Sequence, residues 1–378
     1  MSDDVPVVGV VGGGQLARML HQAAISLGVQ VVVLDPDPEC SAALAGARRV
    51  DGTWTSADDL VAFARSGVDV VTFDHELSAP EDLLALEAQS PVPVRPAPAT
   101  KLAAQDKLHA RRTFAALGLA VPAFAEVATW DEVTAFASGH GWPVVLKSAR
   151  GGYDGRGVWI LGEGDAAEGA EVLASGGTFL AEERVAIDHE LAVMVARRPS
   201  GEVRAWPPFR TTQVDGICTD VTIASPATTS EQAAVTLALD LATQLDLSGV
   251  MAVELFVTGG GDIIINEIAC RPHNSGHVTM DACITGQFEQ HLRAVLDLPL
   301  GDTSSIVPAA AMVNILGGAS AWDASRLAAA LAVEDTTLHL YGKSHRPGRK
   351  LGHVNAIATT PHEALHHARA VADALGSA

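Results

Sequence analysis

The pattern of hydrophobic and polar positions divides the chain into regions of different architecture. In the first hundred residues, apolar strands alternate with amphipathic helices: "VPVVGVV", "QLARMLHQAAISLG", "VQVVVLD", "ADDLVAFARSG" and "VDVVTFD". This alternation predicts a βαβαβ unit built on a parallel sheet. The Pro-rich stretch over residues 90–100 follows and predicts a domain boundary.

Beyond this boundary, the pattern predicts a helix from about residue 98 to 117 and then a small α/β region. Its strands are "WPVVLKSA", "GVWILG" and "TFLAEE". From His189 onward, longer strands predict an antiparallel sheet, with a helix over residues 230–245. The expected fold class is therefore multidomain, α/β and α+β, with a Rossmann-like N-terminal domain.

The segment over residues 249–269, "GVMAVELFVTGGGDIIINEIA", predicts a β-hairpin with a glycine-rich turn. If the turn centres between Gly260 and Gly261, Glu254 faces Glu267. Two like charges about 5 Å apart are unfavourable unless a cation lies between them. Mg²⁺ suits such a pair because it binds one or two carboxylates plus water and phosphate oxygens. A register slip of one residue, with one Glu facing solvent, stays an open alternative.

A glycine-rich turn near the N-terminus suggests a second kind of site. In "VVGVVGGGQLA", Gly12, Gly14 and Ala17 fit the pattern G-x-G-x-x-A, and Asp35 ends the next strand. A glycine turn before a helix binds any anion through free N–H groups, so it does not identify NAD. An NAD-dependent oxidoreductase is an alternative, but it leaves the acidic hairpin unexplained.

Two further segments are typical of a nucleotide site. Residues 144–159, "VVLKSARGGYDGRGVW", place Lys147 on an apolar strand before a glycine-rich loop, as in a flap that closes over phosphates. Residues 180–191, "LAEERVAIDHEL", offer carboxylates between two strands. They are a reasonable setting for contacts to adenine and to ribose hydroxyls.

Basic residues gather in two loops. They are "CRPHNSGH", residues 270–277, and "YGKSHRPGRKLGH", residues 341–353. The net charge of the whole chain is −20, so this local concentration is unusual and favours a phosphate monoester ligand over a solvated loop. No Ser/His/Asp or Cys/His nucleophile arrangement is discernible in the sequence, so no covalent catalysis is expected.

Composition sets the remaining limits. The 378 residues are 48% hydrophobic and 19% charged, which indicates a globular protein of two to three domains. The N-terminus is acidic and no apolar run approaches ~18 residues, so we expect a cytoplasmic protein without a membrane partner. The four cysteines show no CxxC spacing, so we expect them to be reduced thiols. The negative charge also argues against a nucleic-acid partner.

The ordered motifs "GGGQLARM", "TFDHEL", "QDKLHAR", "GGYDGRG", "RPHNSGH" and "RPGRK" resemble those of the N5-carboxyaminoimidazole ribonucleotide synthetases, ATP-grasp ligases of purine biosynthesis, over nearly the whole chain. The resemblance implies a Rossmann-like pre-ATP-grasp domain over residues 1–100. It implies a linker helix and ATP-grasp lid over 101–185, and a larger ATP-grasp domain with a basic tail over 186–378. It also implies a homodimer.

The implied reaction phosphorylates bicarbonate with ATP and Mg²⁺, or Mn²⁺ in its place, and the resulting carboxyphosphate carboxylates 5-aminoimidazole ribonucleotide. The resemblance assigns the metal to Glu254 and Glu267, and catalysis to Lys147, Arg271, His273 and Asn274. It assigns ATP binding to Lys107, Lys147, Gly152, Tyr153, Asp154, Gly155, Arg156, Gly157, Val158, Glu182, Glu183, Arg184, Val185, Glu190, Gln213, Asn266 and Glu267. It assigns ribonucleotide binding to Gln15, Glu76, Tyr153, Arg156, Lys343, Arg349 and Lys350.

Some positions depart from the family pattern. Gln213 stands where the family usually has a His, and it keeps hydrogen bonding but cannot carry charge. Lys107 replaces the usual Arg of "QDR", so a planar fork is lost while the positive charge is kept. Another ATP-grasp carboxylase or transformylase of purine synthesis is the nearest alternative enzyme, and a catalytically inactive nucleotide-binding regulator is a more distant one.

Overall fold

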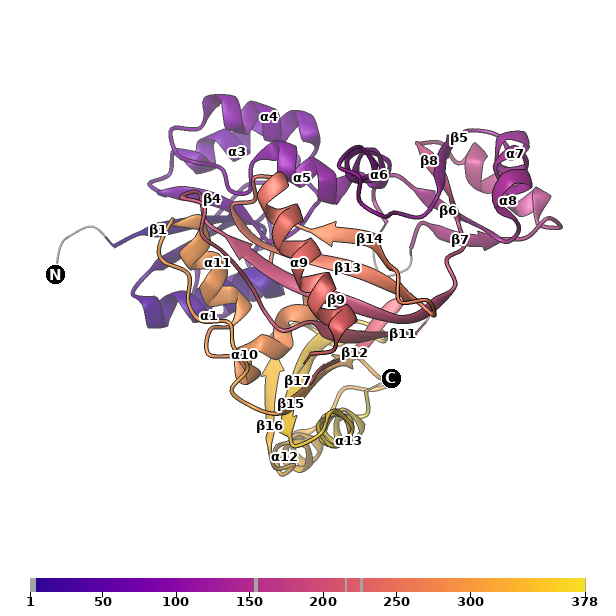
Figure 1. The fold of residues 1–378 in the computed structure, drawn as a ribbon. Helices are drawn as coiled ribbons and strands as arrows, with labels where there is room; N and C mark the ends of the chain where they lie inside the picture. The colour runs from indigo at the N-terminus through magenta and orange to yellow at the C-terminus, as the bar shows by residue number, and fades with distance from the viewer. Residues whose placement is uncertain (1–4, 153–155, 215, 225–226, 378) are drawn as a thin grey trace.

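The structure, a computed structural model, describes residues 5–152, 156–214, 216–224 and 227–377. These residues form three sheets that follow one another along the chain. In Figure 1 the N-terminal sheet and the lid lie at opposite sides of the molecule, with the large sheet between and below them. In the described part of the chain, no helix is long and apolar enough to cross a membrane.

The N-terminal sheet is parallel, as the alternating pattern predicts, and its strand order is β3-β2-β1-β4. Strand β3 and helix α2 were not expected from the pattern, because they are only 3 and 4 residues long. Helix α4 was not expected either. The elements are β1 (Val7–Val11), α1 (Gln15–Leu27), β2 (Gln30–Leu34), α2 (Ser41–Leu44), β3 (Arg48–Val50), α3 (Ala57–Ala64), β4 (Val70–Phe73) and α4 (Pro80–Gln89).

The helix expected over residues 98–117 is two helices, and this part of the prediction is wrong. Asp106 adopts extended φ and ψ angles of −124° and 106°, and its side chain caps the second helix by accepting from His109 N at 2.9 Å. Lys107 therefore lies in the first turn of a new helix. The elements of the linker and lid are α5 (Pro98–Gln105), α6 (Lys107–Ala116), β5 (Phe124–Val127), α7 (Trp130–His140), β6 (Val144–Ser148), β7 (Val158–Leu161), α8 (Ala166–Ala174) and β8 (Phe179–Glu183).

The large sheet is antiparallel, as expected, with strand order β14-β13-β9-β11-β12-β15-β17-β16 and β10 paired with β9. Strand β17 and the last helix were not predicted. The elements are β9 (Ile187–Arg197), β10 (Val203–Ala205), β11 (Phe209–Val214), β12 (Ile217–Ala224), α9 (Thr229–Gln244), β13 (Gly249–Thr258), β14 (Ile263–Ala269), the 3₁₀ helix η1 (Asn274–Val278), α10 (Thr279–Ala282), α11 (Gln287–Val295), β15 (Ala309–Leu316), α12 (Ala324–Leu331), β16 (Thr336–Leu340), β17 (Lys350–Ala358) and α13 (Pro361–Leu375).

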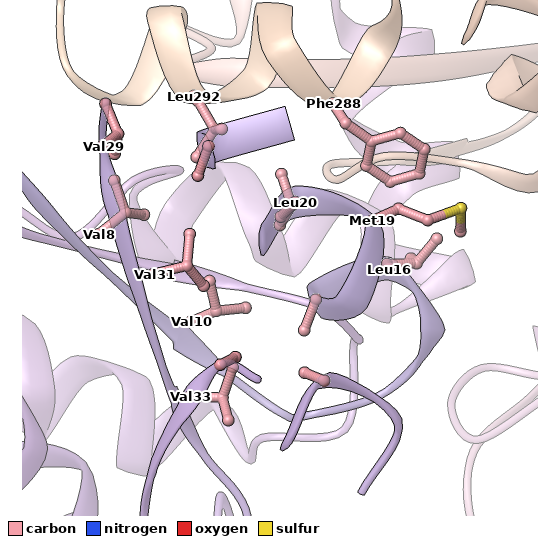
Figure 2. Close-up of a cluster of buried hydrophobic side chains, with 14 of the residues drawn as sticks. Val8, Val10, Leu16, Met19, Leu20, Val29, Val31, Val33, Phe288 and Leu292 are labelled. Carbon is pink, nitrogen blue, oxygen red and sulfur yellow. The ribbon is translucent and has the colours of Figure 1, made fainter. Parts of the chain in front are cut away.

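The N-terminal domain shares a hydrophobic core with the large domain. Leu16, Met19 and Leu20 of α1 pack in one cluster with Phe288 and Leu292 of α11, as Figure 2 shows. Each such side chain contributes about 1.5–3 kcal/mol when fully buried. The two domains are therefore held as one body.

The lid has a core of its own. Val133 of α7, Leu146 of β6 and Phe179 of β8 belong to one cluster, and all members of that cluster lie within residues 125–181. A small second cluster with Leu108 of α6 joins the lid to the linker. The three sheets fall within the three expected ranges, and the domain boundaries at residues 100 and 185 stay predictions.

Candidate active site

The two hairpin carboxylates face each other. Glu254 on β13 is paired with Glu267 on β14, so the predicted register is confirmed at these two residues. The pairs nearer the turn, beginning with Leu255 and Ile265, are shifted by one residue relative to that register. A β-bulge at Asn266 absorbs the shift, and bulges commonly re-aim side chains beside active sites.

A third carboxylate shares this face of the sheet. Glu190 on β9 pairs with Phe256, two residues from Glu254, and alternate residues of a strand share a face. Burial and the neighbouring charges of Glu267 and Glu190 raise the pKa of Glu254. Burial also acts to raise the pKa of Glu267, but Lys107, with Nζ 2.6 Å from its Oε2, outweighs it and lowers that pKa.

The chemistry of this pair fits a hard divalent cation. The side chain of Glu267 is 45% exposed, so it is open to a ligand. His273 Nε2 lies 3.4 Å from Glu254 Oε1. Among the residues that the structure describes, no group of three or more His, Cys, Asp or Glu could hold a metal by itself. A cation at Glu254 and Glu267 would therefore take its other ligands from water or phosphate, as Mg²⁺ does.

Lys147 lies in a buried ionic cluster. Its Nζ is 2.7 Å from Glu182 Oε2, and Arg111 Nε is 2.7 Å from Glu182 Oε1. Two cations against one carboxylate leave excess positive charge, which suits a phosphate oxygen. The Glu182 side chain is bound here, so within the 182–185 stretch any adenine contact would fall to other groups. Arg111 was missed because nothing in "LHARR" separates it from a surface arginine, whereas the structure shows it 1% exposed.

The other expected nucleotide residues line the adjoining strands. Gln213 on β11 hydrogen-bonds the side chain of Glu190, and burial raises the pKa of Glu190. Glu183 Oε1 accepts from Ala123 N at 3.0 Å. Arg184 is exposed and Val185 is half-buried. Gln213, the residue in place of the family's usual His, therefore lies beside Glu190, and the roles of both at the nucleotide stay predictions.

The flap is described at its two ends. Ser148 N donates to Gly157 O at 2.9 Å, which closes the loop between β6 and β7. Gly157 has a positive φ of 74°, and a Cβ on Gly152 would lie 2.6 Å from Arg156 O, so both positions require glycine. Val158 begins β7. Tyr153, Asp154 and Gly155, which the resemblance assigns to ATP binding, lie outside the described residues.

The expected phosphate site joins the two ends of the chain. Lys343 donates a hydrogen bond to Gln15 Oε1 at the start of α1. Burial, and then the nearby charge of Arg349, lower the pKa of Lys343 to about 8, and Lys350 adds to the effect. Arg349 Nη1 is fixed by Ser344, 3.0 Å from its carbonyl oxygen and 2.7 Å from its hydroxyl. The tail loop therefore places its cations beside the N-terminal domain.

One segment connects the two halves of the site. Arg271 Nε lies 3.7 Å from Glu76 Oε1, and His273 contacts Glu254. Asn274 follows at the start of η1, and within the described residues neither polar atom of its side chain has a hydrogen-bond partner. Residues 271–274 therefore extend from the N-terminal domain to the acidic hairpin.

The glycine turn before α1 is occupied by the protein's own carboxylates. Gly13 N donates to Asp35 Oδ2 at 2.7 Å, and Ala17 N donates to Asp74 Oδ2 at 3.4 Å. These are N–H groups that a dinucleotide phosphate would need. The NAD-dependent oxidoreductase alternative depends on free N–H groups in this glycine turn, and these N–H groups are already bound to Asp35 and Asp74.

Comparison with known proteins agrees with this architecture. Residues 112–288 match the ATP-grasp domain family, residues 5–105 the ribonucleotide synthetase preATP-grasp domain, and residues 310–367 the phosphoribosylaminoimidazole carboxylase C-terminal domain. The fold and the site thus define an ATP-grasp enzyme with a preATP-grasp domain before it.

Relatives narrow the class to one family. The chain is 48% identical to N5-carboxyaminoimidazole ribonucleotide synthase from Mycobacterium tuberculosis over 94% of this chain and 84% of that protein, and 42% identical to the same enzyme from Corynebacterium ammoniagenes over 99% and 93%. A solved Aspergillus clavatus synthase, in complex with ADP and 5-aminoimidazole ribonucleotide, superimposes with a TM-score of 0.89 at 32% identity, covering 98% of both chains. The Thermus thermophilus synthetase gives 0.87 at 34%, covering 98% and 99%. The chain belongs to the N5-carboxyaminoimidazole ribonucleotide synthase family.

Proposed function

We propose that this chain uses ATP and bicarbonate to carboxylate the exocyclic amine of 5-aminoimidazole ribonucleotide, giving N5-carboxyaminoimidazole ribonucleotide, ADP and phosphate in purine biosynthesis. Family membership supports the reaction. The observation that carries it is the continuity of the site: residues 271–274 contact both Glu254, in the acidic hairpin, and Glu76, in the loop that follows β4 of the N-terminal domain. Such a segment suits a reaction in which a group passes from one bound substrate to another.

In the ATP half, we assign the phosphate oxygens to Lys107 and Lys147, whose ammonium groups lie among the acidic side chains of the hairpin and of Glu182. Glu254 and Glu267 would hold Mg²⁺, which when bound neutralises charge on the phosphoryl group that is transferred. Because Glu254 has a raised pKa, metal binding must also displace a proton from it near neutral pH.

In the ribonucleotide half, Lys343, Arg349 and Lys350 are assigned to the 5′-phosphate. Arg271 and His273 then lie between the two substrates, where their donors can orient carboxyphosphate. Carboxyphosphate is labile in water, so a lid that closes over it would protect the intermediate. The lid core, separate from the core shared by the other two domains, is compatible with such a movement.

Product analysis with labelled bicarbonate tests the proposal. Label should enter the ribonucleotide product only when ATP, 5-aminoimidazole ribonucleotide and bicarbonate are all present, with one ADP formed per label incorporated. Incorporation from formate instead of bicarbonate would indicate a transformylase. ADP formation that does not depend on the ribonucleotide would refute the assignment.

The family resemblance also supports a homodimer that works in the cytoplasm with Mg²⁺ as its metal. Sedimentation equilibrium should give about twice the chain mass of 39.1 kDa. A single-chain mass at assay concentration would remove the dimer from the proposal without affecting the reaction.

A further inference from the structure

Lys101 is a lysine with no exposed side-chain surface. It lies in α5, and its ammonium donates to Glu76 Oε2 and to the carbonyl oxygen of His75, the latter at 3.2 Å. The same nitrogen lies 4.3 Å from the ring centre of Phe73, a cation–π distance. An ammonium has three donors, and all of these contacts end in residues 73–76, at the end of β4.

Gln105 holds the same loop from the next turn of α5. Its side-chain amide donates to the carbonyl oxygens of Glu76 at 3.1 Å and Ser78 at 2.9 Å. Residues four apart share one face of a helix, so Lys101 and Gln105 act from the same side. Because α5 also packs against α4 and β14, the loop is held by a helix that is itself fixed.

The two oxygens of Glu76 have different environments. Oε2 is bound by Lys101, whereas Oε1 is buried 3.7 Å from Arg271 Nε. Within the described ranges, neither Oε1 nor that nitrogen has a hydrogen-bond partner, and the same holds for His75 Nε2. Buried polar atoms are normally paired, so this group of atoms marks a place where a ligand would supply the missing partners.

The charges around Glu76 come mainly from two cations. Burial lowers the pKa of both His75 and His291, the latter to about 3, and raises the pKa of Cys270, so these three groups are uncharged near pH 7. Although burial acts to raise the pKa of Glu76, the cations outweigh it and the pKa is lowered. The titratable and charged groups around Glu76 and Lys101 are Asp74, His75, Cys270, Arg271 and His291.

The lysine content of the chain is an independent observation. The chain has five lysines and twenty arginines. Four of the lysines, at positions 107, 147, 343 and 350, are those already assigned to the ATP and ribonucleotide halves. Lysine is a compact point charge that arginine does not replace at every site. Lys101, the fifth lysine, is the only one that has no role in either half so far.

We propose that Lys101 is a positioning residue for the ribonucleotide, which fixes Glu76 so that one oxygen is bound and the other is directed at the ligand. This inference rests on the proposed function, with Glu76 at the ribonucleotide as the family resemblance implies. An ionised carboxylate only accepts hydrogen bonds. The group that Glu76 serves is therefore a donor, an amine or hydroxyl of the ribonucleotide.

The experiment compares Lys101→Met, Glu76→Gln and the double variant in the full-length enzyme, with kcat and KM for each substrate measured between about pH 5.5 and 9. Lys101→Met should raise the ribonucleotide KM about 10- to 100-fold, the range for one hydrogen bond to a charged group, and change the ATP KM less than about twofold. The acid limb of kcat/KM for the ribonucleotide should move to higher pH, because Glu76 loses a stabilising cation. The double variant should match Glu76→Gln alone, since Lys101 acts through Glu76.

Multiplicative effects in the double variant, or an acid limb that does not move, would overturn the inference. Arg112→Met is the control: it removes a cation from the exposed Arg112–Glu126 pair and should leave both KM values unchanged. If Lys101→Met does not fold, Lys101→Gln replaces it, because this variant keeps a donor but no charge. The acid limb of its kcat/KM for the ribonucleotide should also move to higher pH. A wild type that incorporates no label, or a Glu76→Gln variant with an unchanged ribonucleotide KM, would count against the proposed function and not against Lys101 alone.

Discussion

Replacing Glu254 by Gln should stabilise the protein in the absence of nucleotide, although it should abolish turnover. Directly paired residues on antiparallel strands have Cβ atoms about 5 Å apart, and two charges at that distance repel by about 3 kcal/mol at an effective dielectric constant of about 20. Lys107, 2.6 Å from Glu267, offsets part of this repulsion. We therefore expect the free energy of unfolding to rise by about 1–2 kcal/mol in the variant.

The gain should depend on pH in a defined direction. In the folded protein the pKa of Glu254 is raised above its ordinary value of 4.5. Below pH 4.5 the Glu254 carboxyl is protonated in both the folded and the unfolded state, so the substitution should change the free energy of unfolding little. As the pH rises from 4.5 to the raised folded pKa, the unfolded state loses its proton while the folded state keeps it, so the wild type loses stability relative to the variant. Above the raised folded pKa the loss is complete.

Thermal unfolding without nucleotide or metal, at about pH 5, 7 and 8.5, measures this effect. The apparent melting temperature of Glu254→Gln should exceed that of the wild type by about 1–3 °C at the highest pH and by much less at the lowest. Glu126→Gln, at an exposed carboxylate, is the matched control and should show no such trend. A variant that melts below the wild type at pH 8.5, or a difference that is the same at every pH, would refute the account of two opposed carboxylates.

Three further predictions concern single residues. Glu267→Gln should abolish turnover with an unchanged circular dichroism spectrum, because it removes a metal-binding charge at constant size; near-normal activity at limiting Mg²⁺ would contradict this. Arg349→Ala should raise the KM for the ribonucleotide about 10- to 100-fold with little effect on ATP, and equal effects on both would place the phosphate site elsewhere. Gln213→Ala should raise the ATP KM about two- to tenfold, the range for one neutral hydrogen bond, and an unchanged ATP KM would detach Gln213 from the nucleotide site.

The parts of the fold that the sequence predicts are those with strong local periodicity. Three of the four strands of the parallel sheet (β1, β2 and β4) and the helices α1 and α3 were expected in the right order, and so was the pairing of Glu254 with Glu267. The bulge at Asn266 was not expected, since the number of residues in a turn does not reveal an extra residue in one strand. The break at Asp106 was also missed, because Asp106 interrupts an otherwise continuous helical pattern only through its role as a cap.

The contacts that complete the site are long-range, and periodicity cannot predict them. Arg111 and Glu182 are 71 residues apart, and Lys343 and Gln15 are 328 apart. The rarity of lysine does carry information about these contacts. Lys101, Lys107 and Lys147 each pair with a carboxylate. Lys343 donates to Gln15 at the start of α1, and Lys350 lies in the basic tail. In a chain of net charge −20, the nearness of Lys107 to Lys147 and of Lys343 to Lys350 creates local positive potential of the kind that two phosphate-bearing substrates require. The placement of lysine thus marks the extent of the site, whereas the motifs mark its separate parts.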